Sequence, residues 1–178
     1  MSRRERLRRV VILCRNFTVN LAYYRTGRKA EHLALQDLRR PRANFWRAVS
    51  GNFIDMCVLE WCKLFADPKG EHYWKKIVSD PANFETQLLN HLRIDKSAFQ
   101  KEIEVMRKYR DKFLAHLDSD EVMNIPALDI AKKAVWFYYA HVVQHEALPG
   151  DLTGLPAELD AGYAQCEDEA RAIYERNA

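Results

Sequence analysis

The feature that most restricts the fold is the stretch from Ala43 to Phe65, which is apolar over a wide arc of a helix. A helix that is apolar on more than one side is buried on more than one side, so this stretch predicts the central helix of a bundle. The whole chain has only six Gly and six Pro, and no segment alternates convincingly as a strand. We therefore expect an all-α protein, with its 178 residues forming a single domain.

Apolar residues recur at helical spacing before and after this central stretch. Pro and Gly positions, such as Pro41, Pro126 and Gly150, separate the periodic segments from one another. The pattern predicts about five long helices and some short ones, in a bundle without internal repeats. The remaining expected helices span residues 4–24, 28–38, 71–78, 81–91, 95–117, 126–147 and a final acidic segment from about 159.

Charge is distributed unevenly along the chain, although the net charge is only +3. Residues 1–40 contain eleven Lys and Arg against three Asp and Glu, whereas residues 117–178 contain four against twelve. A basic face of this kind can bind phosphates, or the two ends can pair with each other or with a second copy. A solvated basic helix packed near an acidic one accounts for the same pattern.

Neither a membrane segment nor a disulfide framework is expected. No apolar run reaches the length of a membrane span, and the basic N-terminus is not followed by the apolar core of a signal peptide. The four cysteines form no Cys-x-x-Cys pair, and each lies on a predicted helix face. We expect a cytoplasmic protein with reduced cysteines in or near its core.

The strongest functional signal is a charged patch, Tyr109–Asp118, which interrupts the apolar stripe of a helix. Arg110 projects within about 40° of the apolar residues of that stripe and is therefore predicted to point inward. Glu60 likewise shares a face with apolar residues of the central helix. An unpaired buried charge is costly, so Glu60 and Arg110 are expected to satisfy each other or to flank a polar cavity.

His116 follows Arg110 by six residues, so on a regular helix the two side chains project about 120° apart. His116 instead shares a flank with Lys112 and Tyr109, while Asp111 lies on the other side of the stripe. The arginine and histidine therefore meet only if the helix unwinds or if two chains combine them across a symmetric dimer.

These residue types suit phosphodiester cleavage. A histidine transfers protons near neutral pH, and an arginine binds a phosphate through two parallel hydrogen bonds. No metal is needed when the 2′-hydroxyl of RNA is the nucleophile, and the sequence contains no convincing cluster of metal-binding carboxylates. A structural ion pair is the competing explanation for a mid-helix arginine.

The string Arg110-Asp111-Lys112-x-x-Ala115-His116-x-Asp118, late in a long helix, resembles the Arg-x(4–6)-His signature of HEPN domains. In particular it resembles the AbiU2-like HEPN proteins linked to abortive phage infection. The residue after the arginine is often Asn in that family and is Asp111 here. The preceding helix with Glu60 and Lys63 adds to the resemblance.

This resemblance implies a HEPN-like bundle over residues 1–147, followed by a C-terminal acidic helix within 151–178, and a symmetric homodimer. It also implies a metal-independent endoribonuclease of a defence or toxin–antitoxin system. Arg110 would bind the scissile phosphate and His116 would be the general acid/base at a dimer cleft, supported by Tyr109, Asp111, Lys112 and Glu60. No cofactor is expected; the expected partners are RNA, a second copy, and an antitoxin or other protein.

Two alternative sites and one alternative function remain open. The pair His141 and His145, followed by Glu146, lies on one helix face and has the spacing of two metal ligands, but it lacks an evident third ligand. The aromatic groups 23–24 and 136–139 have the composition of base-stacking sites, although at helical spacing they are more typical of a core or a dimer interface. The alternative function is a non-catalytic helical dimerisation module that binds RNA or a partner protein.

Overall fold

The computed structural model describes residues 1–37, 39–111 and 124–177, and these residues form helices and loops without a strand. This confirms the all-α class predicted from the sequence. The main helices are α1 (Arg3–Gly27), α3 (Ala43–Trp61), α4 (Pro81–Leu92), α5 (Lys96–Tyr109), α6 (Asp129–His141) and α7 (Asp160–Glu175). The shorter ones are α2 (Ala30–Leu33), η1 (Ala34–Gln36), η2 (Cys62–Ala66), η3 (Trp74–Lys76) and η5 (Val142–Glu146).

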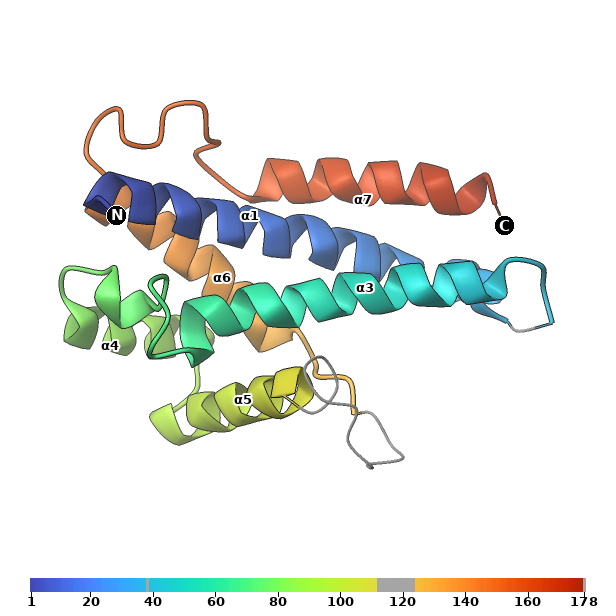
Figure 1. The fold of residues 1–178 in the computed structure, drawn as a ribbon, viewed down its shortest axis with the longest axis horizontal. Coiled ribbons are helices and arrows are strands. Elements are labelled where there is room, and N and C mark those ends of the chain that lie inside the picture. Colours follow the sequence, from blue (N-terminus) through green and yellow to red (C-terminus); the bar gives the residue numbers. More distant parts are fainter. Residues whose placement is uncertain (38, 112–123, 178) are drawn as a thin grey trace.

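The centre of the molecule is the pair α1 and α3, which run antiparallel and side by side (Figure 1). Helix α6 crosses behind them, α4 and α5 lie below α3, and α7 runs along the outer side of α1. Large side chains from several of these helices fill the core, among them Phe17, Trp61, Phe65, Phe84 and Tyr138. Burial of these aromatic rings is the main source of stability in a bundle of this kind.

Local capping determines where several helices begin. Ser2 and Glu5 form a reciprocal capping box at the start of α1. The side chains of Asp80 and Asp95 accept backbone hydrogen bonds at the starts of α4 and α5. The starts of α4 and α5 therefore fall where the sequence predicts them.

The basic N-terminal end of α1 pairs with the segment that follows α6. Arg3 forms a salt bridge with Glu146, and Arg8 donates a hydrogen bond to the carbonyl oxygen of Asp151. Part of the charge separation along the chain is therefore satisfied within one molecule.

Helix α7 packs on α1 and completes a second, smaller apolar cluster of Leu35, Trp46, Ala170 and Tyr174. Gly27, the last residue of α1, lies against the hydroxyl end of the Tyr174 side chain. A Cβ atom built on Gly27 would lie 2.6 Å from Cζ of that ring, so the contact requires a glycine.

Two further sequence expectations are tested by the structure. The cysteines are all free thiols, with Cys14, Cys57 and Cys62 buried and Cys166 partly buried, as predicted. Within the described part of the chain, no helix combines the length and the apolar character that a membrane crossing requires.

Candidate functional site

The charged patch begins where α5 ends against the middle of α3. Tyr109 is buried, and its hydroxyl donates a 2.7 Å hydrogen bond to Oδ1 of Asp55 on α3. Burial, together with this bond to a carboxylate, raises the pKa of Tyr109, so its hydroxyl keeps its proton. Tyr109 thus anchors the end of α5 on α3.

Arg110 and Asp111 follow directly and continue the chain in a π-helical turn. Nε of Arg110 donates to Oδ1 of Asp111 at 2.7 Å, and this bond raises the pKa of the guanidinium. The Arg110 side chain is 27% exposed and that of Asp111 is 58% exposed. Arg110 is therefore partly withdrawn from solvent, as the helical projection suggests, but it is not enclosed in the core.

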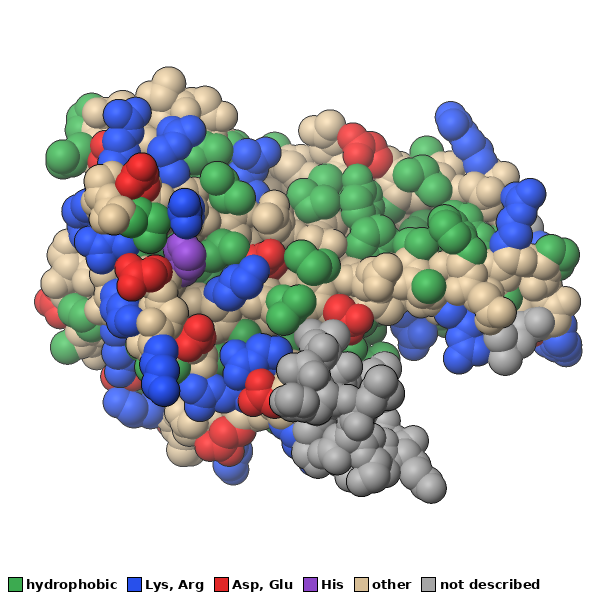
Figure 2. Space-filling view, in the orientation of Figure 1, with side chains coloured by type: hydrophobic (Ala, Val, Ile, Leu, Met, Phe, Trp, Pro, Cys, Tyr) green, Lys and Arg blue, Asp and Glu red, His purple; other side chains and the backbone are tan. Residues whose placement is uncertain are grey.

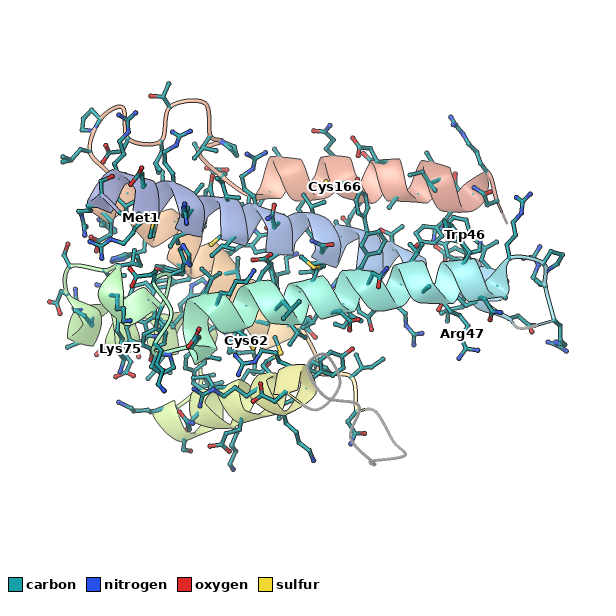
Figure 3. All side chains as sticks on the ribbon, in the orientation of Figure 1. Met1, Trp46, Arg47, Cys62, Lys75 and Cys166 are labelled. Atoms are coloured by element: carbon teal, nitrogen blue, oxygen red, sulfur yellow. The ribbon has the colours of Figure 1, made fainter. Side chains whose placement is uncertain are left out.

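Glu60 is buried but does not pair with Arg110. Its Oε2 lies 3.3 Å from Nζ of Lys63, one turn further along the chain. The charge of Arg110 acts instead on the thiol of Cys62 (Figure 3), the first residue of η2, which packs on α5. Glu60 and Cys62 are two residues apart, so their side chains project about 200° apart on the helix. Arg110 acts on Cys62 and therefore not on Glu60. The expected Glu60–Arg110 pair was therefore wrong.

The other two predicted site residues, Lys112 and His116, lie outside the described residues. Their roles, and the convergence of His116 with Arg110, stay predictions. The described part of the patch thus consists of Tyr109, Arg110 and Asp111.

Other basic side chains lie on α5 and on the neighbouring elements η2 and α1. Arg107, one turn before Arg110, donates from Nε to the carbonyl oxygen of Ala66 at 2.7 Å and closes the end of η2. His72 lies near Arg9 and Lys63; burial lowers its pKa, and these two charges lower it further. Figure 2 shows Lys and Arg side chains spread over the part of the molecule around α1, η2 and α5, with Asp and Glu among them. Arg107 and Arg110 both act on Cys62, as do the carboxylates of Asp111 and Asp67, so the charges of the patch are mixed in sign.

A second polar cluster is built around the carboxylate of Glu146, whose side chain is 2% exposed. It accepts hydrogen bonds from the backbone N–H of Ser79 at 2.7 Å, from the Ser79 hydroxyl at 2.6 Å and from Arg3. Nε2 of His141 lies 3.2 Å from Oε1, the carboxylate oxygen that also accepts from the backbone N–H of Ser79. Burial disfavours the charged form of Glu146, but the bonds from Ser79, His141 and Arg3 outweigh burial and lower its pKa.

The π-helical turn η5 explains how this cluster forms. Residues five apart on a regular α-helix project about 140° apart, whereas a π-helical turn bonds residue i to i+5 and brings them onto one side. His141 and Glu146 are five residues apart and meet through η5. A pocket of about 290 Å³ beside them is lined by His145, Asp80 and Asn83 among others.

Of the two histidines considered as metal ligands, His141 belongs to the hydrogen-bonded network of Glu146, and His145 packs against the ring of His141. The rings of His141 and His145 are 5.0 Å apart, and Glu146 is already bonded to three other residues. Over residues 1–37, 39–111 and 124–177, no three His, Cys, Asp or Glu side chains are grouped as a metal ion would require.

The aromatic groups pack mainly inside the molecule. Tyr138 and Tyr139 are buried in the core. Trp136 donates from Nε1 to Asp160, and the hydroxyl of Tyr23 donates to Glu169, so both contribute to the contacts of α7. The expectation of core or interface packing is therefore confirmed for residues 138 and 139.

Comparison of the chain with protein-family models, characterised proteins and solved structures gave no match. The resemblance to HEPN domains accordingly rests on the residues of the motif itself, from Arg110 to Asp118.

Proposed function

We propose that this protein is a metal-independent endoribonuclease of the HEPN type, belonging to a defence or toxin–antitoxin system. Arg110 binds the scissile phosphate, His116 is the general acid/base, and two chains form the RNA-binding cleft. Attack by the RNA 2′-hydroxyl on the adjacent phosphorus forms the new P–O bond, and the 5′-oxygen leaves with a proton. The products are a 2′,3′-cyclic phosphate and a 5′-hydroxyl end.

The observation that carries this proposal is that the Arg110 side chain is partly exposed and bonds to Asp111 through Nε. The carboxylate of Asp111 accepts a hydrogen bond from Nε of Arg110 at 2.7 Å, and the Arg110 side chain is 27% exposed. The edge formed by the two Nη groups is the one that matches two phosphate oxygens. A phosphate can therefore bind end-on without first breaking the bond to Asp111.

The surrounding charge supports the same conclusion. Arg107 lies near the patch, as does the carboxylate of Asp67, and Lys108 is exposed in the last turn of α5. Contacts with several phosphates supply most of the sequence-independent affinity for nucleic acids. A substrate with repeated phosphates fits this surface better than a small neutral molecule does.

The test is to incubate the purified protein with RNA in EDTA and to map the new ends. Cleavage that leaves cyclic phosphates, and that is lost in Arg110→Ala and His116→Ala but kept in Lys108→Ala, is expected. Induced expression should slow growth for the wild type and not for His116→Ala. Equal toxicity, or no toxicity in either strain, would count against nuclease activity.

The alternative, a non-catalytic helical module that dimerises and binds RNA or a protein, is favoured by one observation. The Arg110–Asp111 ion pair is a contact that such a module would keep as a structural feature. The two functions differ in the RNA experiment, because the module binds RNA without producing new ends.

A further inference from the structure

The pocket beside the Glu146 cluster lies at the end of the bundle where the start of α1, α4 and the end of α6 meet (Figure 1). We call it the α4–η5 pocket. Its volume of about 290 Å³ is close to the lower limit of small-molecule sites. Its described lining residues all carry polar or charged side chains, among them Asp80, Asn83 and Gln87 from the start of α4 and His141, His145 and Glu146 from the end of α6 and η5. Neither Arg110 nor Asp111 lines it, so it is separate from the candidate RNA site.

His141 is held in one orientation at the wall of this pocket. Its Nε2 lies 3.2 Å from Oε1 of Glu146, whose pKa is lowered by the bonds that it accepts. A carboxylate only accepts hydrogen bonds, so Nε2 carries the proton of this contact. Burial lowers the pKa of His141, so the ring is neutral at pH 7.5 and Nδ1 is an acceptor. No described residue bonds to Nδ1, which is therefore left for a ligand.

The π-helical turn η5 gives the pocket this wall. His141 and Glu146 meet because such a turn brings residues five apart onto one side. Single π-helical turns are rare and are frequent at functional sites. The side chain of Glu146 is only 2% exposed, and burying a carboxylate costs free energy that an apolar residue would not. Both features are more typical of a binding site than of a packed core.

The wall formed by α4 supplies two more acceptors. Oδ1 of Asp80 accepts the backbone N–H of Asn83 at 3.1 Å and caps α4, whereas no described residue bonds to Oδ2. Nε2 of Gln87 donates to Oδ1 of Asn83 at 3.2 Å, and no described residue bonds to Oε1 of Gln87. Oδ2 of Asp80, Oε1 of Gln87 and Nδ1 of His141 are thus acceptors without a donor. The pocket calls for a ligand that is rich in donors.

Charge narrows the class of ligand further. None of the described residues that line the pocket is Lys or Arg. Arg3, which bonds to Glu146, also donates to Ser79 and to the carbonyl oxygen of Ile77, so the charge of Asp80 has no counter-ion in the lining. An anion is therefore repelled. A metal ion does not fit either, because the described residues contain no group of three His, Cys, Asp or Glu that could hold one. An ammonium group combines a positive charge with three donors.

We propose that the α4–η5 pocket binds a small primary amine through its ammonium group. Asp80 is the counter-ion, and Nδ1 of His141 and Oε1 of Gln87 accept further N–H bonds. Hydrogen bonds to a charged group are stronger than those between neutral groups, so the ammonium contributes most of the affinity. The site does not depend on the proposed function, because it shares no residue with the Arg110 patch.

The test compares three probes that have the same four-carbon chain and differ in the head group: n-butylamine, 1-butanol and butyrate. Each is titrated into the full-length protein at pH 7.5, and the ring signals of His141 are followed by NMR, with His141→Gln to assign them. n-Butylamine should shift these signals to saturation and raise the melting temperature, because a ligand of the folded state stabilises it. 1-Butanol should bind about tenfold more weakly or less, since it lacks the charge-assisted bonds. Butyrate should not bind.

Asp80→Asn removes the counter-ion and keeps the helix start, because Asn caps a helix as well as Asp does. It should weaken the binding of n-butylamine about tenfold or more. Asp95→Asn is the matched control: Asp95 caps α5 in the same way and does not line the pocket, so binding should be unchanged. Equal weakening in both variants would mean attraction to the overall charge of the protein and would overturn the proposal.

Three further results would also overturn it. They are butyrate binding as tightly as n-butylamine, unchanged binding of n-butylamine in Asp80→Asn, and saturable binding of Zn²⁺ alone without binding of n-butylamine. The last result would make the pocket a metal site. RNA cleavage enters none of these measurements, so the outcome is independent of whether the protein is a nuclease.

Discussion

Tyr109 and Asp55 are fifty-four positions apart in the chain and are joined by a 2.7 Å hydrogen bond that fixes the end of α5 on the middle of α3. Arg110 is the next residue, so its position depends on this bond. The anchor therefore links the stability of the bundle to the geometry of the candidate site.

Replacing Tyr109 by Phe keeps the buried ring and removes only the hydroxyl. We expect a loss of about 1 kcal/mol in the free energy of unfolding, the net value of one such hydrogen bond. Urea denaturation of Tyr109→Phe, Asp55→Ala and the double variant should give a coupling energy of similar size. If the two single losses simply add, the hydroxyl and the carboxylate do not interact as described.

The His141–Glu146 contact predicts how stability depends on pH. Burial lowers the pKa of His141, although Glu146 acts in the opposite direction. The unfolded chain therefore binds a proton on His141 at a higher pH than the folded chain does. The contribution of His141 to stability is present above about pH 6.5 and is lost as the pH falls below it, by at most about 1.4 kcal/mol per pH unit.

The measurement is the free energy of unfolding at about pH 7.5 and about pH 5.5 for the wild type and His141→Gln, each about one pH unit from the ordinary pKa of histidine. The slope that His141 contributes should disappear in the variant. Glu146 contributes in a separate, more acidic range, since its lowered pKa makes its stabilisation fade only below the ordinary value of 4.5. An unchanged slope in His141→Gln would show that His141 does not titrate differently in the two states.

The sequence predicted most of the helical architecture, because apolar spacing and caps such as Asp80 and Asp95 act locally. It failed where a helix departs from regular geometry. The meeting of His141 with Glu146 depends on the π-helical turn η5, which no α-helical projection contains. The Asp55–Tyr109 bond and the contact of Gly27 with Tyr174 depend on how distant helices dock, and residue spacing within one helix carries no information on that.

The contact between Gly27 and Tyr174 predicts that Gly27 cannot be replaced by a larger residue without loss of stability. In Gly27→Ala the new Cβ would lie 2.6 Å from Cζ of the Tyr174 ring, so the ring and the end of α7 must shift. We expect destabilisation of about 1–3 kcal/mol, as in other overpacked cores. Gly162→Ala is the matched control, because Gly162 lies inside α7 with nothing within 4 Å of an added Cβ. That change should be neutral or stabilise by about 0.5–1 kcal/mol. Thermal unfolding of both variants measures the difference, and equal melting temperatures would contradict the contact.

Asp111 gives the most selective prediction for the candidate site, because the proposed role of Arg110 requires two changes in the same ion pair to act in opposite directions. Asp111→Asn removes a negative charge beside the phosphate and releases Nε of Arg110, so RNA binding and cleavage should increase. Since Asp111 is 58% exposed, the gain should be modest, up to about fivefold, the range of an exposed ion pair. Arg110→Lys should lose activity, because an ammonium group cannot bind two phosphate oxygens through a planar fork.

Cleavage rates and RNA affinities at two salt concentrations measure both effects, with Lys108→Ala as a control that should alter only the salt dependence. If Asp111→Asn weakens binding as much as Arg110→Lys does, the ion pair itself is the functional unit, and Arg110 does not bind the phosphate.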